Sequence, residues 1–145
     1  MKIHRTANHR RAGFSLAELM VVIVIIGLLA TLVVPSVIKK LFTANIGKAK
    51  GDIAVIEGAL NDYAIENNGM WPESLQELVT PDENGFTFLK GTSIPLDPWR
   101  NEYAYEPPTP GQTVPTITCY GADGVPGGEG QDQDFTNHMI RSGEI

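Results

Sequence analysis

The chain has 145 residues, 42% of them hydrophobic, and a formal net charge of -6. This length suits one domain with an attached anchor rather than two domains. Four basic residues and no acidic ones precede residue 14, so the rest of the chain is more acidic than the whole. Nucleic-acid binding needs a basic face that neutralises phosphates, and the acidic balance argues against that class of function.

An apolar segment covers residues 14–34, with Glu18 as its one charged residue. Its roughly 21 residues, rising about 1.5 Å each in a helix, can cross a bilayer core of about 30 Å. An ordinary secretory signal has a shorter apolar stretch followed by small residues at the cleavage site. Here the small residue, Gly13, comes before the segment. The basic residues ahead of it predict that the N-terminus stays cytoplasmic while the remainder crosses the membrane once.

Helical periodicity continues beyond Pro35. Apolar residues recur at intervals of three and four: Ile38, Phe42, Ile46, Ala49, Ile53, Ile56, Leu60 and Tyr63. This spacing predicts one long helix from about Phe14 to about Asn67, apolar in its first half and amphipathic in its second. Proline removes a backbone donor and crowds the preceding turn, so we expect a kink or local melting over residues 31–35 rather than a helix end.

Short elements follow the long helix. The sequence Asn67-Asn68-Gly69 predicts its C-terminus, and Ser74 with Glu77 three residues on predicts a capping box that starts a short helix. Strand-like runs over residues 86–89, 102–105 and 116–120 are separated by proline and glycine. We therefore expect an α+β fold, in which a small antiparallel sheet packs on the amphipathic half of the long helix.

The N-terminal motif joins a basic leader, Gly13, Phe14 and Glu18 to the long apolar segment. This arrangement resembles the processing signal of type IV pilins and their relatives. The resemblance implies that a prepilin peptidase cuts between Gly13 and Phe14 and methylates the new amine of Phe14. Residues 1–13 would then be a leader peptide, and Glu18 would recognise a neighbouring copy during assembly.

The chemistry of Glu18 agrees with that role. A carboxylate within a membrane segment costs about 2.5–3.5 kcal/mol on insertion scales for comparable charges. After cleavage the amine of Phe14 lies one helical turn away, and in a bundle of identical helices each amine can meet a neighbour's carboxylate. The alternative is a plain anchor in which Glu18 reaches to the headgroups, but that alternative leaves Gly13-Phe14 unexplained.

A second cluster, over residues 121–135, holds four acidic residues and five glycines. Calcium takes carboxylate and carbonyl oxygens in flexible loops, and glycines let a chain wrap closely around an ion. The spacing is not that of an EF-hand. On chemistry alone, a calcium site and a solvated acidic loop are both consistent with this composition.

The segment 94–103, which reads IPLDPWRNEY, is followed by Gly-Ala-Asp-Gly and a late Asp-x-Asp. This series resembles the major pseudopilins of type II secretion systems. The resemblance implies a calcium site formed by the carboxylates of Asp123, Asp132 and Asp134 and by backbone carbonyls at Tyr120 and Val125. Arg100 departs from the family, which has glycine there. Asp97 and Trp99 are interpreted as turn and core residues.

The resemblance implies a structural subunit. Residues 14–35 would form the transmembrane and fibre-core segment, and residues 36–145 a globular domain in the periplasm, anchored in the bacterial inner membrane. Expected partners are other copies of the chain, minor pseudopilins, the prepilin peptidase and the inner-membrane secretion platform. The fibre would drive export of folded proteins.

Three other functions are alternatives to that of a pseudopilus subunit. The lone Cys119 excludes a pilin with a C-terminal disulfide loop, although a type IV pilin without one, or a minor pseudopilin, remains an alternative. We expect Cys119 to be a small half-buried apolar residue. An enzyme is disfavoured, because His138 is the only histidine beyond the leader.

Overall fold

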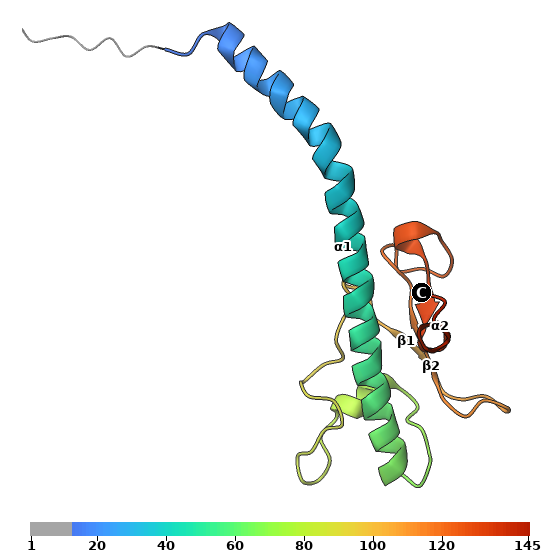
Figure 1. Ribbon diagram of the computed structural model, residues 1–145. Helices are drawn as coiled ribbons and strands as arrows, with labels where there is room; N and C mark the ends of the chain where they lie inside the picture. The colour runs from blue at the N-terminus through green and yellow to red at the C-terminus, as the bar shows by residue number, and fades with distance from the viewer. Residues whose placement is uncertain (1–12) are drawn as a thin grey trace, which may run out of the picture. The chain divides into compact units, whose positions relative to one another are not determined.

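The computed structural model describes residues 13–145, which form two compact units that divide between Lys39 and Lys40. Figure 1 shows the elements, whose bounds in chain order are α1 (Leu16–Glu66), η1 (Leu75–Val79), β1 (Ala104–Glu106), β2 (Thr116–Cys119), η2 (Gly130–Asp132), β3 (Phe135–Thr136) and α2 (Asn137–Ser142). The predicted α+β fold is confirmed: one long helix precedes a small antiparallel sheet.

The long helix α1 is unbroken, with Pro35 in its interior. The prediction that the helix continues past Pro35 is therefore confirmed, and residues 31–35 are helical in the single subunit, without local melting. Proline removes only the one hydrogen bond that its own nitrogen would donate, and the flanking turns retain theirs. Nearby, the hydroxyl of Thr31 donates to the carbonyl of Leu28 at 2.7 Å. The C-terminus forms as predicted, because Asn68 and Gly69 take positive φ angles of 57° and 84° and Gly69 N–H donates to the Ala64 carbonyl.

The sheet has the strand order β1-β2-β3, and both pairs are antiparallel. The predicted strands over 102–105 and 116–120 are present with slightly shifted bounds. The predicted strand over 86–89 is wrong. Leu89 is buried and its N–H donates to the Leu78 carbonyl, so one backbone hydrogen bond and the buried side chain attach the segment to η1. Among residues 13–145, the segment pairs with no strand.

Two C-terminal elements, β3 and α2, were not predicted because they contain only two and six residues. Polar contacts attach α2 to α1. Arg141 pairs with Glu57 at 2.9 Å, and the side chain of Asn137 donates to the same carboxylate at 2.6 Å. Asn137 is itself buried, and its side-chain oxygen accepts from the N–H of Ile117 in β2.

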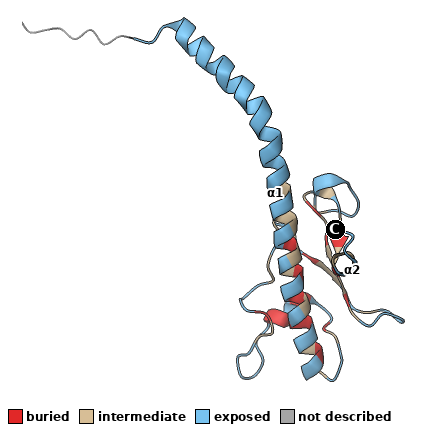
Figure 2. Ribbon diagram, in the orientation of Figure 1, coloured by how far each residue is buried: buried red, intermediate tan, exposed pale blue. Residues whose placement is uncertain are grey.

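The core lies entirely within residues 49–135. Figure 2 shows buried positions on the C-terminal half of α1 and exposed positions along its first half. The buried residues of α1 are Ala49, Ile53, Ile56, Ala59, Leu60 and Ala64. All of them except Ala64 share one cluster with Leu78 of η1, Ile117 of β2 and Phe135 of β3. The predicted stripe is thus confirmed from Ala49 onward, whereas Ile38 remains 48% exposed.

The short helix η1 is a 3₁₀ helix, and its predicted capping box between Ser74 and Glu77 is confirmed. The Glu77 carboxylate accepts from the N–H groups of Glu73 and Ser74 and from the hydroxyl of Tyr63, the last at 2.6 Å. The hydrogen bond from Tyr63 is the main cause that lowers the pKa of Glu77, and the same bond raises the pKa of Tyr63. This carboxylate therefore fixes η1 to α1.

Candidate functional site

The first candidate site is the start of α1. Phe14 is 83% exposed, and a methyl group placed on Gly13 would meet no atom within 4 Å. Glu18 accepts from Ser15 N–H at 2.8 Å, while Ser15 Oγ accepts from Glu18 N–H at 3.2 Å. These reciprocal bonds form a capping box that satisfies two of the helix's unpaired donors. In the single subunit, Glu18 is thus bound within its own chain.

The role of Ser15 was missed, although the Ser-x-x-Glu spacing that revealed the cap at Ser74 also occurs at Ser15 and Glu18. Glu18 was expected to contact another copy of the chain, so its hydrogen bond to Ser15 was not predicted. Residues 1–12 of the predicted leader lie outside the described residues.

The first part of α1 presents an apolar surface that remains exposed among the described residues 13–145. Every residue from 13 to 41 is exposed, and the most apolar window of 18 residues has a mean hydropathy of 2.9. By length and composition this helix can span a membrane. Such a surface requires lipid or protein around it, because soluble monomers rarely expose apolar patches larger than a few hundred Å².

The second candidate site begins at the turn formed by residues 97–101. Asp97 is buried, and its Oδ1 accepts from the N–H groups of Trp99 and Asn101 at 2.9 and 2.8 Å. Its Oδ2 accepts from the Cys119 thiol at 3.5 Å. Cys119 is fully buried rather than half-buried, and burial raises its pKa to about 12. Asp97 thus has the turn-forming role predicted for it.

Asn101 connects this turn to the glycine-rich loop, a function that the sequence did not reveal. Its side-chain nitrogen donates to the Gly121 carbonyl at 2.9 Å. A Cβ on Gly124 would lie 2.8 Å from the side chain of Asn101, so only glycine fits without a shift. The turn therefore supports the loop at two points.

The loop itself wraps around Asp132. A Cβ on Gly121 would lie 2.7 Å from the carbonyl carbon of Asp132, and a Cβ on Gly128 would lie 2.5 Å from its carbonyl oxygen. Both glycines also have positive φ angles, 68° and 100°. Ala122 N–H donates to the Gln131 carbonyl at 2.8 Å and closes the loop. Glycine is thus required here for space as well as for conformation.

The predicted calcium ligands are arranged as follows. Asp123 Oδ1 accepts from Val125 N–H at 3.2 Å, and Asp134 Oδ2 accepts from Gly127 N–H at 2.7 Å. Asp134 Oδ1 is buried and has no hydrogen-bond partner among the described residues. Within residues 13–145, no three His, Cys, Asp or Glu side chains are gathered as a metal-binding group, so Asp123, Asp132 and Asp134 are not assembled into one cluster. Calcium binding stays a prediction.

The loop nevertheless fits calcium in its donor chemistry. It offers carboxylate and carbonyl oxygens, which are the ligands that calcium takes. The unpaired Asp134 Oδ1 is the specific feature that a cation would satisfy, because a buried carboxylate oxygen without a partner is costly.

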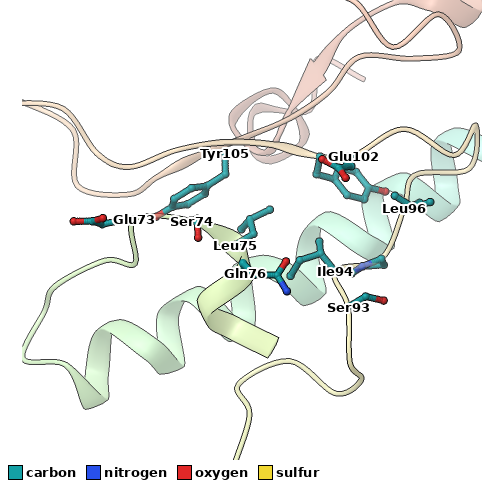
Figure 3. A pocket seen from close by; sticks show the side chains of 11 residues that line it. Glu73, Ser74, Leu75, Gln76, Ser93, Ile94, Leu96, Glu102 and Tyr105 are labelled. Carbon is teal, nitrogen blue, oxygen red and sulfur yellow. The ribbon is translucent and has the colours of Figure 1, made fainter. Parts of the chain in front are cut away.

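A separate cavity of about 480 Å³ lies between η1, the loop before Asp97 and β1 (Figure 3). Glu73, Gln76 and Glu102 contribute polar groups, and Leu75 and Ile94 contribute apolar surface. Its tyrosines are engaged elsewhere: Tyr103 donates to Asp52 at 3.1 Å and Tyr105 donates to the Pro72 carbonyl. His138 lies outside this cavity, with Nε2 3.3 Å from the Thr116 hydroxyl oxygen.

The chain joins an exposed apolar N-terminal helix to a small α+β domain, and a glutamate carboxylate caps the start of that helix. This combination defines the class of pilin-like subunits. Residues 8–34 match the prokaryotic N-terminal methylation motif, in agreement with that class. Residues 36–138 match the model of the type II secretion system protein G family, and the chain belongs to this family.

Curated relatives and a solved structure agree with this assignment. The chain is 39% identical to the type II secretion system core protein G of Vibrio cholerae, over 91% of this chain and 94% of that protein. It is 38% identical to the Pseudomonas aeruginosa protein of the same name, over 90% and 96% of the two chains. The crystal structure of the major pseudopilin of enterohaemorrhagic Escherichia coli matches with a TM-score of 0.54 and 27% identity, covering 70% and 89% of the chains.

Proposed function

We propose that this protein is the main structural subunit of a periplasmic pseudopilus that drives export of folded proteins through a type II secretion system. The observation that carries the proposal is the uncovered apolar surface of α1 in a chain of the protein G family. Copies of α1 side by side would bury this surface, first in the inner membrane and then in the fibre. The role is structural, and no catalytic step is assigned to the protein.

Processing starts the pathway. A prepilin peptidase cuts after Gly13 and methylates the amine of Phe14. In support, Gly13 and Phe14 lie before the first turn of α1, and Phe14 is exposed. Mass spectrometry of assembled material should give a mature N-terminus at Phe14 with one added methyl group. A mature N-terminus within or after the apolar segment would contradict this step.

Assembly then exchanges the partner of Glu18. In the single subunit its carboxylate accepts from Ser15 N–H, which lowers the cost of carrying it into lipid. In the fibre the methylated amine of a neighbouring Phe14 provides a charged partner, and hydrogen bonds to charged groups are worth about 1.5–3 kcal/mol. Glu18 therefore favours the assembled state without preventing insertion. Minor pseudopilins and the inner-membrane platform would start and extend the fibre.

Two substitutions separate the functions of Glu18. Glu18→Ala should keep membrane insertion and abolish fibres in electron micrographs of sheared material. Ser15→Ala is the matched control, because it removes the hydroxyl that accepts from Glu18 N–H, while the carboxylate and its bond from the backbone N–H of residue 15 remain, so fibres should persist. Equal loss of fibres in both variants would mean that the loss comes from a weakened helix start and not from a missing partner for a neighbouring Phe14. Normal fibres from Glu18→Ala would leave the carboxylate without a role in assembly.

We also propose that calcium stabilises the loop of residues 120–134. Asp123, Asp132 and Asp134 would hold it through carboxylates, and Tyr120 and Val125 through carbonyls. Bound calcium supplies a positive charge among acidic groups and a partner for Asp134 Oδ1. Binding to the folded state alone contributes about 2.7 kcal/mol at a hundredfold excess over Kd.

Thermal melting in calcium and in chelator tests this proposal. Calcium should raise the melting temperature of the wild type by roughly 10–20 °C, from about 4–8 °C per kcal/mol in a domain of this size. Asp134→Asn should lose most of that response, whereas Glu129→Gln, an acidic residue of the same loop outside the ligand set, should keep it. Magnesium should substitute poorly, because it requires a tighter octahedral shell. The same melting temperature for wild type in both conditions would refute the site.

A further inference from the structure

An apolar cup lies at the C-terminal end of α1, where the helix meets the loop of residues 82–88. It encloses about 480 Å³ and is lined by Asp62, Ile65, Glu66, Asp82, Phe86, Thr87 and Phe88. Ile65 and Phe86 are 78% and 77% exposed. Phe88 has its ring centroid 5.2 Å from that of Tyr63, so the base of the cup is fixed to the helix. Two large apolar side chains thus face solvent around a hollow on the surface of the domain.

The rim of this cup is negatively charged. Three carboxylates line it, Asp62, Glu66 and Asp82, and no basic side chain does. Asp82 Oδ1 accepts from the N–H groups of Asn84 and Phe86, both at 2.8 Å, and these bonds hold the loop closed. The backbone N–H of Phe86 is the main cause that lowers the pKa of Asp82, so this carboxylate is charged at neutral pH. An apolar surface with this rim selects an occupant that is both basic and apolar.

The same chain carries a segment with that composition, at Lys40 and Leu41 of α1. Both residues are exposed, Leu41 to 59%, and among the described residues no ion pair involves Lys40. Of the other basic groups of this unit, Lys48 pairs with Asp52 at 2.6 Å, Arg141 pairs with Glu57 at 2.9 Å and Lys50 donates to the Ile145 carbonyl. Lys90 and Arg100 are exposed, but they lie in loops and not on a helix. The Lys40–Leu41 segment therefore offers a cation and an adjacent apolar side chain on a rigid helix.

We propose that the cup of one copy binds the Lys40–Leu41 segment of a second copy, with Leu41 against Ile65 and Phe86 and Lys40 facing the carboxylates. The inference rests on the proposed fibre, because it requires copies whose α1 helices run in the same direction. Lys40 and Glu66 are 26 residues apart on one helix, or about 39 Å at 1.5 Å per residue. The two copies are consequently staggered by about that distance along the fibre axis.

This contact joins two different surfaces, so it is heterologous. It leaves a free cup on one copy and a free segment on the other, and such contacts propagate into filaments rather than closed dimers. The contact also places a cation beside acidic groups of a chain whose net charge is more negative than -6 once the basic leader is removed, and so offsets repulsion between copies.

Cysteine cross-linking in assembled fibres tests the contact. Full-length chains with both Lys40→Cys and Glu66→Cys, treated with a short bis-maleimide, should give a ladder of covalent oligomers. Each single variant should give none, and the two single variants expressed together should give dimers only. Lys40→Cys with Val55→Cys is the matched control, since Val55 is also an exposed residue of α1, 59% exposed, outside the cup. The native Cys119 is buried and does not contribute.

Charge exchange supplies a second readout. Lys40→Glu and Glu66→Lys should each reduce fibre yield several-fold, and the double variant should recover at least half of the loss. Fibres that form normally without a ladder, a ladder of equal strength in the control, or cross-linking of Lys40→Cys only to a different protein would each overturn the contact and leave the proposed function standing. Absence of fibres from the wild type would overturn both.

Discussion

Replacing Arg100 by glycine should stabilise the globular unit. Arg100 has a φ of 78°, a left-handed conformation, within the turn of residues 97–101. Such a conformation costs an ordinary residue about 1–2 kcal/mol, which glycine avoids. Glycine loses more backbone freedom on folding, a cost of about 0.5–1 kcal/mol. The Arg100 side chain is exposed, so its removal leaves no cavity, and the expected net gain is about 0.5–1 kcal/mol.

The assay is thermal unfolding of residues 40–145, a unit that contains the whole core. The midpoint should rise by about 2–8 °C. Asn68→Gly is the matched control: Asn68 also has a positive φ, 57°, but asparagine tolerates this region, so its midpoint should hardly change. An unchanged or lowered midpoint for Arg100→Gly would refute the assignment of strain to this position.

Three further predictions concern the same unit. Cys119, buried and with its pKa raised to about 12, should react with a thiol reagent at pH 8 only on unfolding; rapid labelling of the folded protein would contradict its burial. Glu77 has its pKa lowered below 4.5, so its contribution to the free energy of unfolding is present above that pH and is lost as the pH falls through the folded value. Glu77→Gln should therefore melt below the wild type at pH 7, and the gap should close in acid; a constant gap would refute the linkage. Gly128→Ala should lower the free energy of unfolding in denaturant by about 1–3 kcal/mol, because the new Cβ would lie 2.5 Å from the Asp132 carbonyl oxygen. Gly127→Ala should cost less, because its Cβ would meet no atom within 4 Å. Equal losses in the two variants would exclude the contact with Asp132 as the cause.

Local patterns in the sequence predicted much of the fold. The spacing of Ala49, Ile53, Ile56 and Leu60 marks the buried face of α1 because helical neighbours recur every three to four residues. Two of the three predicted strands form, since alternation and bounding turns are local signals as well. The segment at residues 86–89 has the composition of a strand, but pairing also requires an adjacent strand, which composition does not report.

The candidate sites are harder to predict from the sequence than the helices and strands, because they depend on contacts between residues that lie far apart in the chain. The donation from Asn101 to Gly121 joins positions 20 residues apart. Ile65 of α1 and Phe86 line the same cup, although they lie 21 positions apart, because the loop of residues 82–88 folds back towards the helix. The methylation motif was identifiable because its elements lie within one short segment. The predicted calcium ligands lie close in sequence, yet their side-chain directions depend on the backbone of five positive-φ glycines.

The separation of the buried core from the first part of α1 has a consequence for the proposed fibre. The buried cluster begins at Ala49, and Ile46 is the earliest residue packed against it, so folding of the domain does not depend on what surrounds the apolar segment. In the proposed assembly, a subunit would therefore pass from the bilayer into a filament without unfolding. The free energy of that exchange would be set by the helix surface alone, whether lipid chains or neighbouring helices cover it. Substitutions in the segment would then tune assembly while the domain keeps its stability.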